Sequence, residues 1–160
     1  MGQVLSQFRS GFPGAVSRSV DYVIQSHRNA SEGEIPFGAP VFHVAGECAC
    51  KPYDSSATEE NFLGIAVRAA AKTPDTYGES TAAFAPGDLV DVMVRGSAVL
   101  YFGNAAALPG SKVYLRKSDG GLQTFPGTDG STLLLPGAAV RTARDGSGCA
   151  EVVLTRRNLL

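Results

Sequence analysis

Tryptophan is absent from the 160-residue chain, and histidine and cysteine are scarce, with two and three residues. Without tryptophan, a carbohydrate-binding platform built on stacked tryptophans is disfavoured. The odd number of cysteines argues against a closed disulfide framework and fits a reducing compartment best, although one disulfide plus one thiol stays open. No apolar run reaches the eighteen or so residues of a membrane span, and no secretion signal is recognisable. We therefore expect a protein that stays in the cytosol or is released by lysis.

Net charge is also small, because fourteen basic residues oppose fifteen acidic ones and leave −1. We expect neither a direct nucleic-acid partner nor a membrane partner, since so small a charge attracts neither over the whole surface. The charges are nevertheless uneven: residues 31–60 hold six acids and one base, whereas residues 111–160 hold seven bases and four acids. Such segments suit self-association or docking to a patterned protein surface, and they equally suit an ordinary solvated surface.

The length and the 44% hydrophobic share predict one compact domain with a real core. Glycine and proline together make up 19 + 9 = 28 residues, so the chain is rich in turns. A Pro-Gly dipeptide, which suits the two central positions of a type II turn, occurs five times: Pro13-Gly14, Pro86-Gly87, Pro109-Gly110, Pro126-Gly127 and Pro136-Gly137. Those at 86, 109 and 136 continue as Pro-Gly-x-x-Val, which predicts turns that lead into strands.

Alternating apolar residues support this interpretation. Val90, Val92 and Val94 share one face of a strand, and Asp91 and Met93 share the other. Helical signals are weak, and strand signals recur about every ten residues, which predicts an all-β fold, a compact sandwich or small barrel, with a jelly roll possible. The strand candidates are residues 41–45, 62–69, 88–94, 98–102, 111–116, 132–135, 138–141 and 149–155.

The first forty residues differ from the rest. Residues 1–14 have no alternating pattern, and the prolines and glycine of residues 35–40 interrupt any regular ladder. We predict an extended N-terminal arm and the segment that leads into the body over residues 1–40, followed by a β body over residues 41–160.

No pattern demands catalysis, a cofactor or a metal. His27 and His43 lack an accompanying nucleophile motif and are interpreted as structural or surface histidines. Cys48 and Cys50, joined by a distant Cys149, are weak indicators of zinc and are better explained as small, half-buried apolar residues. The Asp-Gly spots at residues 119–120, 129–130 and 145–146 fit turns rather than phosphate or calcium loops.

Several segments, in order, resemble tailed-bacteriophage structural cement or head-decoration proteins. They are Gly11-Phe12-Pro13-Gly14, Arg18-Ser19-Val20-Asp21, residues 35–41, residues 62–68 and residues 86–97. The resemblance implies a non-enzymatic, compact β domain that binds the outside of the assembled capsid and bridges neighbouring major capsid subunits as a dimer or trimer. It implies two partners, the major capsid protein and the chain itself, and a place on the virion after assembly in the host cytoplasm.

The family does not fix which residues touch the capsid, so we add an interpretation of our own. The arm and the acidic segment lack core periodicity, and an extended arm can add a strand to, or lie across, neighbouring subunits. The candidate contacts with the capsid or a second copy are Phe8, Arg9, Phe12, Pro13, Arg18, Glu32, Glu34, Phe37, Arg156 and Arg157.

Two other functions stay open at this stage. One is a receptor- or glycan-binding β-sandwich module of a virion tail, which would be expected to show an exposed aromatic cluster or a calcium loop. The other is a small cysteine- or metal-dependent enzyme that uses Cys48, Cys50 and His43.

Overall fold

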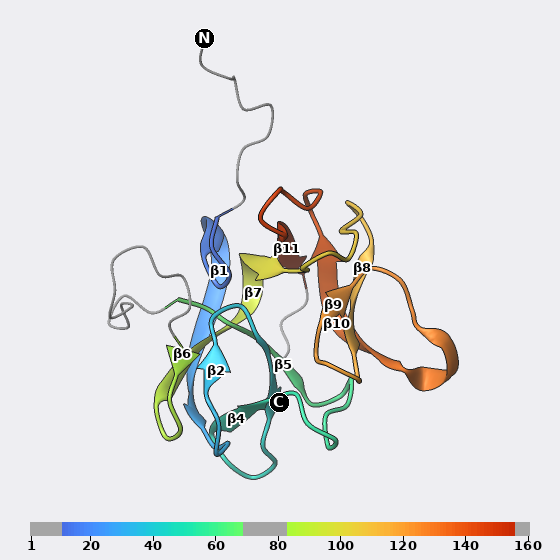
Figure 1. The fold of residues 1–160 in the computed structure, drawn as a ribbon. Helices are drawn as coiled ribbons and strands as arrows, with labels where there is room; N and C mark the ends of the chain where they lie inside the picture. Colours follow the sequence, from blue (N-terminus) through green and yellow to red (C-terminus); the bar gives the residue numbers. More distant parts are fainter. Residues whose placement is uncertain (1–10, 69–82, 156–160) are drawn as a thin grey trace.

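The computed structural model describes residues 11–68 and 83–155 (Figure 1). In these ranges the chain is all-β, as predicted, and includes no helix long and apolar enough to cross a membrane. The elements are β1 (Val16–Asn29), β2 (Ile35–Pro36), β3 (Pro40–His43), β4 (Ala49–Pro52), β5 (Phe62–Ala66), β6 (Ala83–Phe84), β7 (Leu89–Tyr101), β8 (Lys112–Arg116), β9 (Leu122–Gln123), the 3₁₀ turn η1 (Thr128–Gly130), β10 (Thr132–Val140) and β11 (Cys149–Leu154).

Five strands close into a small barrel in the order β1-β4-β3-β5-β7, and β7 pairs back with β1. Most rungs are antiparallel, whereas β1 and β4 run parallel and share only two register pairs, Arg28 with Ala49 and Asn29 with Cys50. Of the two predicted architectures, the small barrel therefore describes this ring of strands.

β7 connects the barrel to a second layer (Figure 1). β1 pairs with β7 from Leu89 to Ala98. The partner on the other edge of β7 is first β5 and, from Gly96 on, β11, after which the sheet continues through β10 and β8 to β9. Gly96 lies at the change of partner with a φ of 126°, and a Cβ there would approach the Tyr22 Cβ to 2.7 Å. The two strands predicted over residues 88–94 and 98–102 are thus one strand that passes through a glycine.

The predicted alternation is confirmed, and the two faces of β7 contribute side chains to different buried clusters. Val90, Val92 and Val94 belong to one buried cluster with Ile35, Phe37 and Phe84 from the β2–β6 side. Met93, on the opposite face, belongs to a cluster that includes side chains of β8, β10 and β11. On the face of Met93, burial is incomplete at the start of the strand, where Leu89 is 68% exposed.

Residues 16–29 form β1 and pair with β7, although the sequence analysis placed them in the arm. The register shifts three times between Val16 and Ile24, so β1 has no regular alternation that sequence patterning could detect. Among the described residues of the arm, only 11–15 precede this strand.

Three of the five predicted Pro-Gly turns are confirmed. The amides of Ala15, Asp88 and Ser111 donate to the carbonyls of Phe12, Ala85 and Leu108, and each central glycine has a φ near 80°. The prediction is wrong at Gly127, whose φ of −78° is not that of a type II turn. At Pro136-Gly137 the glycine has the predicted positive φ, 77°, but the dipeptide lies inside β10 rather than before a strand, at a bulge where the register against β8 shifts.

Candidate functional site

Two tight turns cross where the chain enters the body. The Pro13-Gly14 turn packs against the turn at Phe37-Gly38, and both glycines have a positive φ. A Cβ on Gly14 would lie 2.8 Å from the Gly38 nitrogen, and a Cβ on Gly38 would lie 2.9 Å from the Gly14 nitrogen. The backbones therefore touch only because neither residue has a side chain. We call residues 12–14, 37–38 and Arg68 the junction.

Hydrogen bonds tie the junction to β5 and β7. The Gly14 amide donates to the Val99 carbonyl (2.8 Å), the Gly38 amide donates to the Ala66 carbonyl (2.7 Å), and the Arg68 amide donates to the Gly14 carbonyl (2.8 Å). Three segments that carry the family resemblance, at residues 11–14, 35–41 and 62–68, thus meet at one place in the fold.

The side chain of Arg68 lies between two aromatic rings. Its guanidinium carbon is 5.6 Å from the centre of the Phe12 ring and 5.2 Å from that of Phe37, which are cation–π distances. The Phe37 ring in turn contacts Phe84 edge to face, with centroids 5.1 Å apart. Arg68 Nη1 is buried and has no hydrogen-bond partner in the described part of the chain.

A largely apolar groove of about 710 Å³ opens beside the junction. Phe12 and Tyr101 contribute exposed rings, 56% and 57% accessible. Asp119 is the one acidic residue of the lining, and both its oxygens accept hydrogen bonds at 3.0 Å from Arg116. The groove is lined by Gly11, Phe12, Pro13, Pro36, Phe37, Gly38, Ala39, Pro40, Tyr101, Asp119, Gly120, Gly121, Leu122, Ser147 and Cys149.

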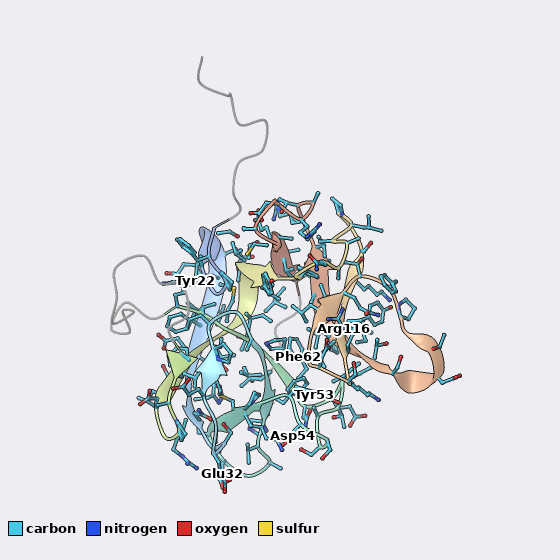
Figure 2. All side chains as sticks on the ribbon, viewed as in Figure 1. Tyr22, Glu32, Tyr53, Asp54, Phe62 and Arg116 are labelled. Atoms are coloured by element: carbon cyan, nitrogen blue, oxygen red, sulfur yellow. The ribbon has the colours of Figure 1, made fainter. Side chains whose placement is uncertain are left out.

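An acidic loop follows β1. Glu32 (Figure 2) and Glu34 are both exposed, and neither forms an ion pair in the described ranges. The loop starts beside the first residues of β7, because Arg28 pairs with Leu89 and the Asn29 amide donates to the Asp88 carbonyl. The groove lies beside Tyr101, at the other end of β7, and the chain returns to its lining at Pro36.

The structure brings together part of the predicted contact set. Phe12, Pro13 and Phe37 meet at the junction, whereas Glu32 and Glu34 lie in the loop after β1, whose last residues pair with the start of β7. Phe37 is only 5% exposed, so in the single chain its side chain supports Arg68 rather than facing solvent. Phe8, Arg9, Arg156 and Arg157 lie outside the described residues, as does the side chain of Arg18. Contact with a partner stays a prediction for all ten.

Sequence reasoning missed Arg68 and Tyr101 as members of this site. Arg68 ended a segment quoted for the resemblance, but its position between Phe12 and Phe37 depends on contacts across 56 and 31 positions of the chain. Tyr101 stands at the end of an alternating strand and had no sequence signal beyond its size.

The residues considered for a metal do not converge. His27 Nδ1 lies 3.9 Å from Cys48 Sγ, and the His27 and His43 rings are 6.5 Å apart. Cys48 is exposed, whereas Cys50 and Cys149 are buried, and burial raises the pKa of the Cys50 thiol to about 12. Within residues 11–68 and 83–155, no group of three or more such side chains could hold a metal ion.

Stability should fall in mild acid because of His27. Burial and the nearby His43 lower the pKa of His27 below 6.5, so the unfolded chain binds this proton more readily than the folded one. Stability is therefore unaffected by this group above about pH 6.5 and decreases as the pH falls through 6.5 towards the lowered value. Urea unfolding from pH 7.5 to 5 should show a smaller loss for His27→Gln than for the wild type. Equal losses would refute this assignment.

The chain is similar in sequence to one protein family and in fold to a solved capsid protein chain. A family model described as structural cement protein (E217 gp24/Pam3 gp6) matches residues 2–155. A chain of the solved capsid of Myoviridae phage XM1 has the same fold, with a TM-score of 0.73, 18% sequence identity and 96% of each chain covered. No curated protein matches the chain.

Proposed function

The chain belongs to the family of phage structural cement proteins, and from this premise we propose that it binds the outer capsid surface and bridges neighbouring major capsid subunits. In doing so it stabilises the DNA-filled head, as a homodimer or homotrimer. The family is one of structural proteins, which supports a structural role for this chain in the capsid of the virion. The match over residues 2–155 is the observation that carries the proposal.

Cementing requires binding free energy across joints between subunits. An oligomer that contacts several subunits gains from multivalency, so individually weak contacts sum to durable attachment. The junction suits such a contact because its backbone is fixed by short hydrogen bonds while Phe12 stays exposed. Aromatic residues, phenylalanine among them, are enriched in the cores of protein–protein interfaces.

Co-sedimentation with mature capsids that lack the protein tests the proposal. We expect saturation at a copy number commensurate with the two-fold or three-fold sites of the capsid. Phe12→Ser should weaken binding about 30-fold, the effect of an interface hot spot of roughly 2 kcal/mol. Phe125→Ser is a matched control, because Phe125 is exposed to a similar extent, 54%, and lies outside the groove.

Each outcome bears on a different part of the proposal. Absence of binding by the wild type would reject capsid binding and favour the receptor-binding module. Equal weakening by both variants would reject the junction as the contact. Decorated particles should also release DNA at a higher temperature than bare ones, and equal temperatures would reject head stabilisation.

A further inference from the structure

We propose that Arg68 is a positioning residue that holds the Phe12 ring in the orientation in which it meets the capsid. The inference rests on the proposed function, because it concerns the Phe12 contact named there. Arg68 acts through Phe12 and supplies no capsid contact of its own. Its guanidinium lies between the Phe12 and Phe37 rings, and this placement carries the inference.

A series of contacts leads from the buried core to the exposed ring. Phe84 is fully buried, and its ring contacts that of Phe37, which is 5% exposed, edge to face. Phe37 in turn lies 5.2 Å from the guanidinium carbon of Arg68, and the same carbon lies 5.6 Å from the centre of the Phe12 ring. The exposed ring is therefore connected to the core through Arg68.

Hydrogen bonds fix the backbone at both ends of the cation–π contact. The Arg68 amide donates to the Gly14 carbonyl (2.8 Å), and the Gly14 amide donates to the Val99 carbonyl (2.8 Å). The Ala15 amide donates to the Phe12 carbonyl (3.0 Å). The freedom that is left at Phe12 is the rotation of its ring about the side-chain bonds, which exposed residues undergo within picoseconds to nanoseconds. The guanidinium restrains this rotation by attracting the face of the ring.

Arginine suits this role better than lysine does. The guanidinium is planar and delocalised, so it can lie against two rings at once, whereas the ammonium group of lysine is a compact and strongly hydrated point charge. A ring that is already held loses less conformational freedom when it binds, which strengthens binding without adding a contact. From the strength of an exposed cation–π contact we expect a gain in capsid affinity of about fivefold.

A double-mutant cycle in capsid co-sedimentation tests the proposal. Arg68→Met keeps most of the apolar stem and removes the planar cation. In the wild-type background it should weaken capsid binding about fivefold. In the Phe12→Ser background it should have no further effect, because no ring is left to hold. Equal weakening in both backgrounds, or no weakening in the wild-type background, would overturn the proposal.

Three controls separate ring positioning from charge and from folding. Arg68→Lys keeps the charge without the planar group, so it should still bind less tightly than the wild type, and full binding would overturn the role of the planar contact. Arg95→Met removes an arginine that is paired with Asp21 (2.6 Å) outside the groove, and it should leave binding unchanged. Arg68→Met should melt within about 3 °C of the wild type, and a larger drop would assign Arg68 to folding stability instead.

NMR relaxation of the rings in the isolated full-length protein is an independent readout. The Phe12 ring should move with a larger amplitude in Arg68→Met than in the wild type. The Tyr101 ring is the internal reference, because it is similarly exposed (57%) but packs against backbone, where a Cβ on Gly148 would lie 2.8 Å from its Cε2. An unchanged Phe12 ring, or equal changes in both rings, would overturn the proposal.

Failure of this inference differs from failure of the proposed function. Capsid binding by the wild type without coupling between Arg68 and Phe12 would reject only the positioning role. Absence of capsid binding by the wild type would reject the proposed function and, with it, the role of Arg68 in capsid binding.

Discussion

Gly64→Ala should destabilise the protein by about 3 kcal/mol or more, which lowers the melting temperature by roughly 6–12 °C for a chain of this size. A Cβ on Gly64 would lie 2.1 Å from the Met93 carbonyl oxygen and 2.9 Å from its carbon. The obstacle is the backbone of β7, which cannot rotate away as the end of a side chain can. The substitution therefore forces β5 away from β7 and strains the closure of the barrel.

The position of Gly64 explains why only glycine fits. The register between β3 and β5 shifts between Val41 and Phe42, so β5 carries an extra residue opposite β3 and turns this position towards β7. Gly33→Ala is the matched control, since a Cβ there meets no atom within 4 Å. It should change stability by no more than about 0.5 kcal/mol. Equal melting temperatures for Gly64→Ala and wild type would show that the barrel opens at this contact without cost.

Local patterning predicted several strands. The predicted strands at 41–45, 62–69, 111–116 and 149–155 correspond to β3, β5, β8 and β11, because each is a short, largely apolar or alternating run bounded by turn residues. The turns at Gly14, Gly87 and Gly110 could also be predicted, because proline and glycine favour the dihedral angles of a type II turn.

The closure of the barrel and the candidate site could not be predicted from local patterning. β1 pairs with β7 through bulges, so its pattern carries no period, and the parallel β1–β4 rungs join residues about twenty positions apart. The Pro136-Gly137 dipeptide has the local chemistry of a turn, but pairing with β8 and β11 on either side keeps it within β10. The junction requires contacts between segments that are separate in sequence, and only the resemblance linked them beforehand.

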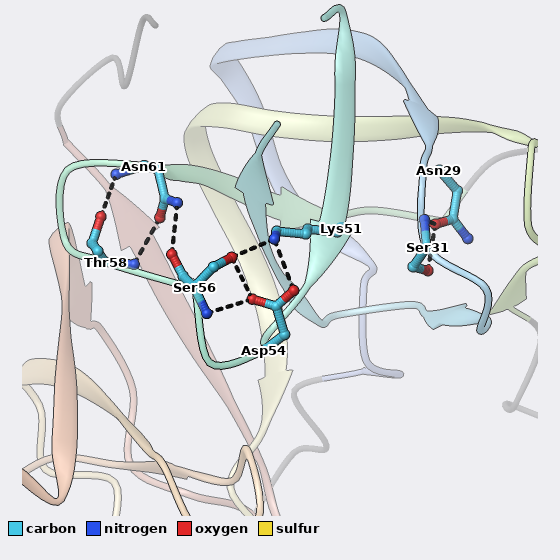
Figure 3. Close-up of polar contacts among 7 residues, drawn as sticks. All are labelled: Asn29, Ser31, Lys51, Asp54, Ser56, Thr58 and Asn61. Atoms are coloured by element: carbon cyan, nitrogen blue, oxygen red, sulfur yellow. Dashed lines mark hydrogen bonds and ion pairs between the residues drawn. The ribbon is translucent and has the colours of Figure 1, made fainter. Parts of the chain in front are cut away.

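Among isosteric substitutions near the acidic loop, Asn29→Asp should cause the largest loss of folding stability. Asn29 is 1% exposed, and its Nδ2 donates to the carbonyls of Gly33 (2.9 Å), Phe84 (3.3 Å) and Ala85 (3.2 Å). Its Oδ1 accepts from the amide and hydroxyl of Ser31 (Figure 3). One side chain thus joins the end of β1, the loop that carries Glu32 and Glu34, and the turn before β7.

A carboxylate keeps the acceptor but cannot donate. It would leave carbonyl oxygens unpaired and place a charge against them, which should cost about 3 kcal/mol or more at neutral pH. Burial and the facing carbonyls raise the pKa of the introduced group above that of an ordinary aspartate, so the unfolded chain releases the proton more readily. The loss of stability should therefore shrink as the pH falls, because the protonated group can donate again.

Asn61→Asp supplies the comparison that separates this effect from the charge alone. Asn61 makes a similar local set of bonds, accepting from the Thr58 amide and donating to the Ser56 carbonyl (Figure 3), but these contacts are exposed to water. It should cost no more than about 1 kcal/mol, because water replaces the lost bond. Urea unfolding of both variants at pH 7.5 and pH 5 measures the difference. If Asn29→Asp matched Asn61→Asp at both values, the buried amide would not be what holds the acidic loop beside the barrel.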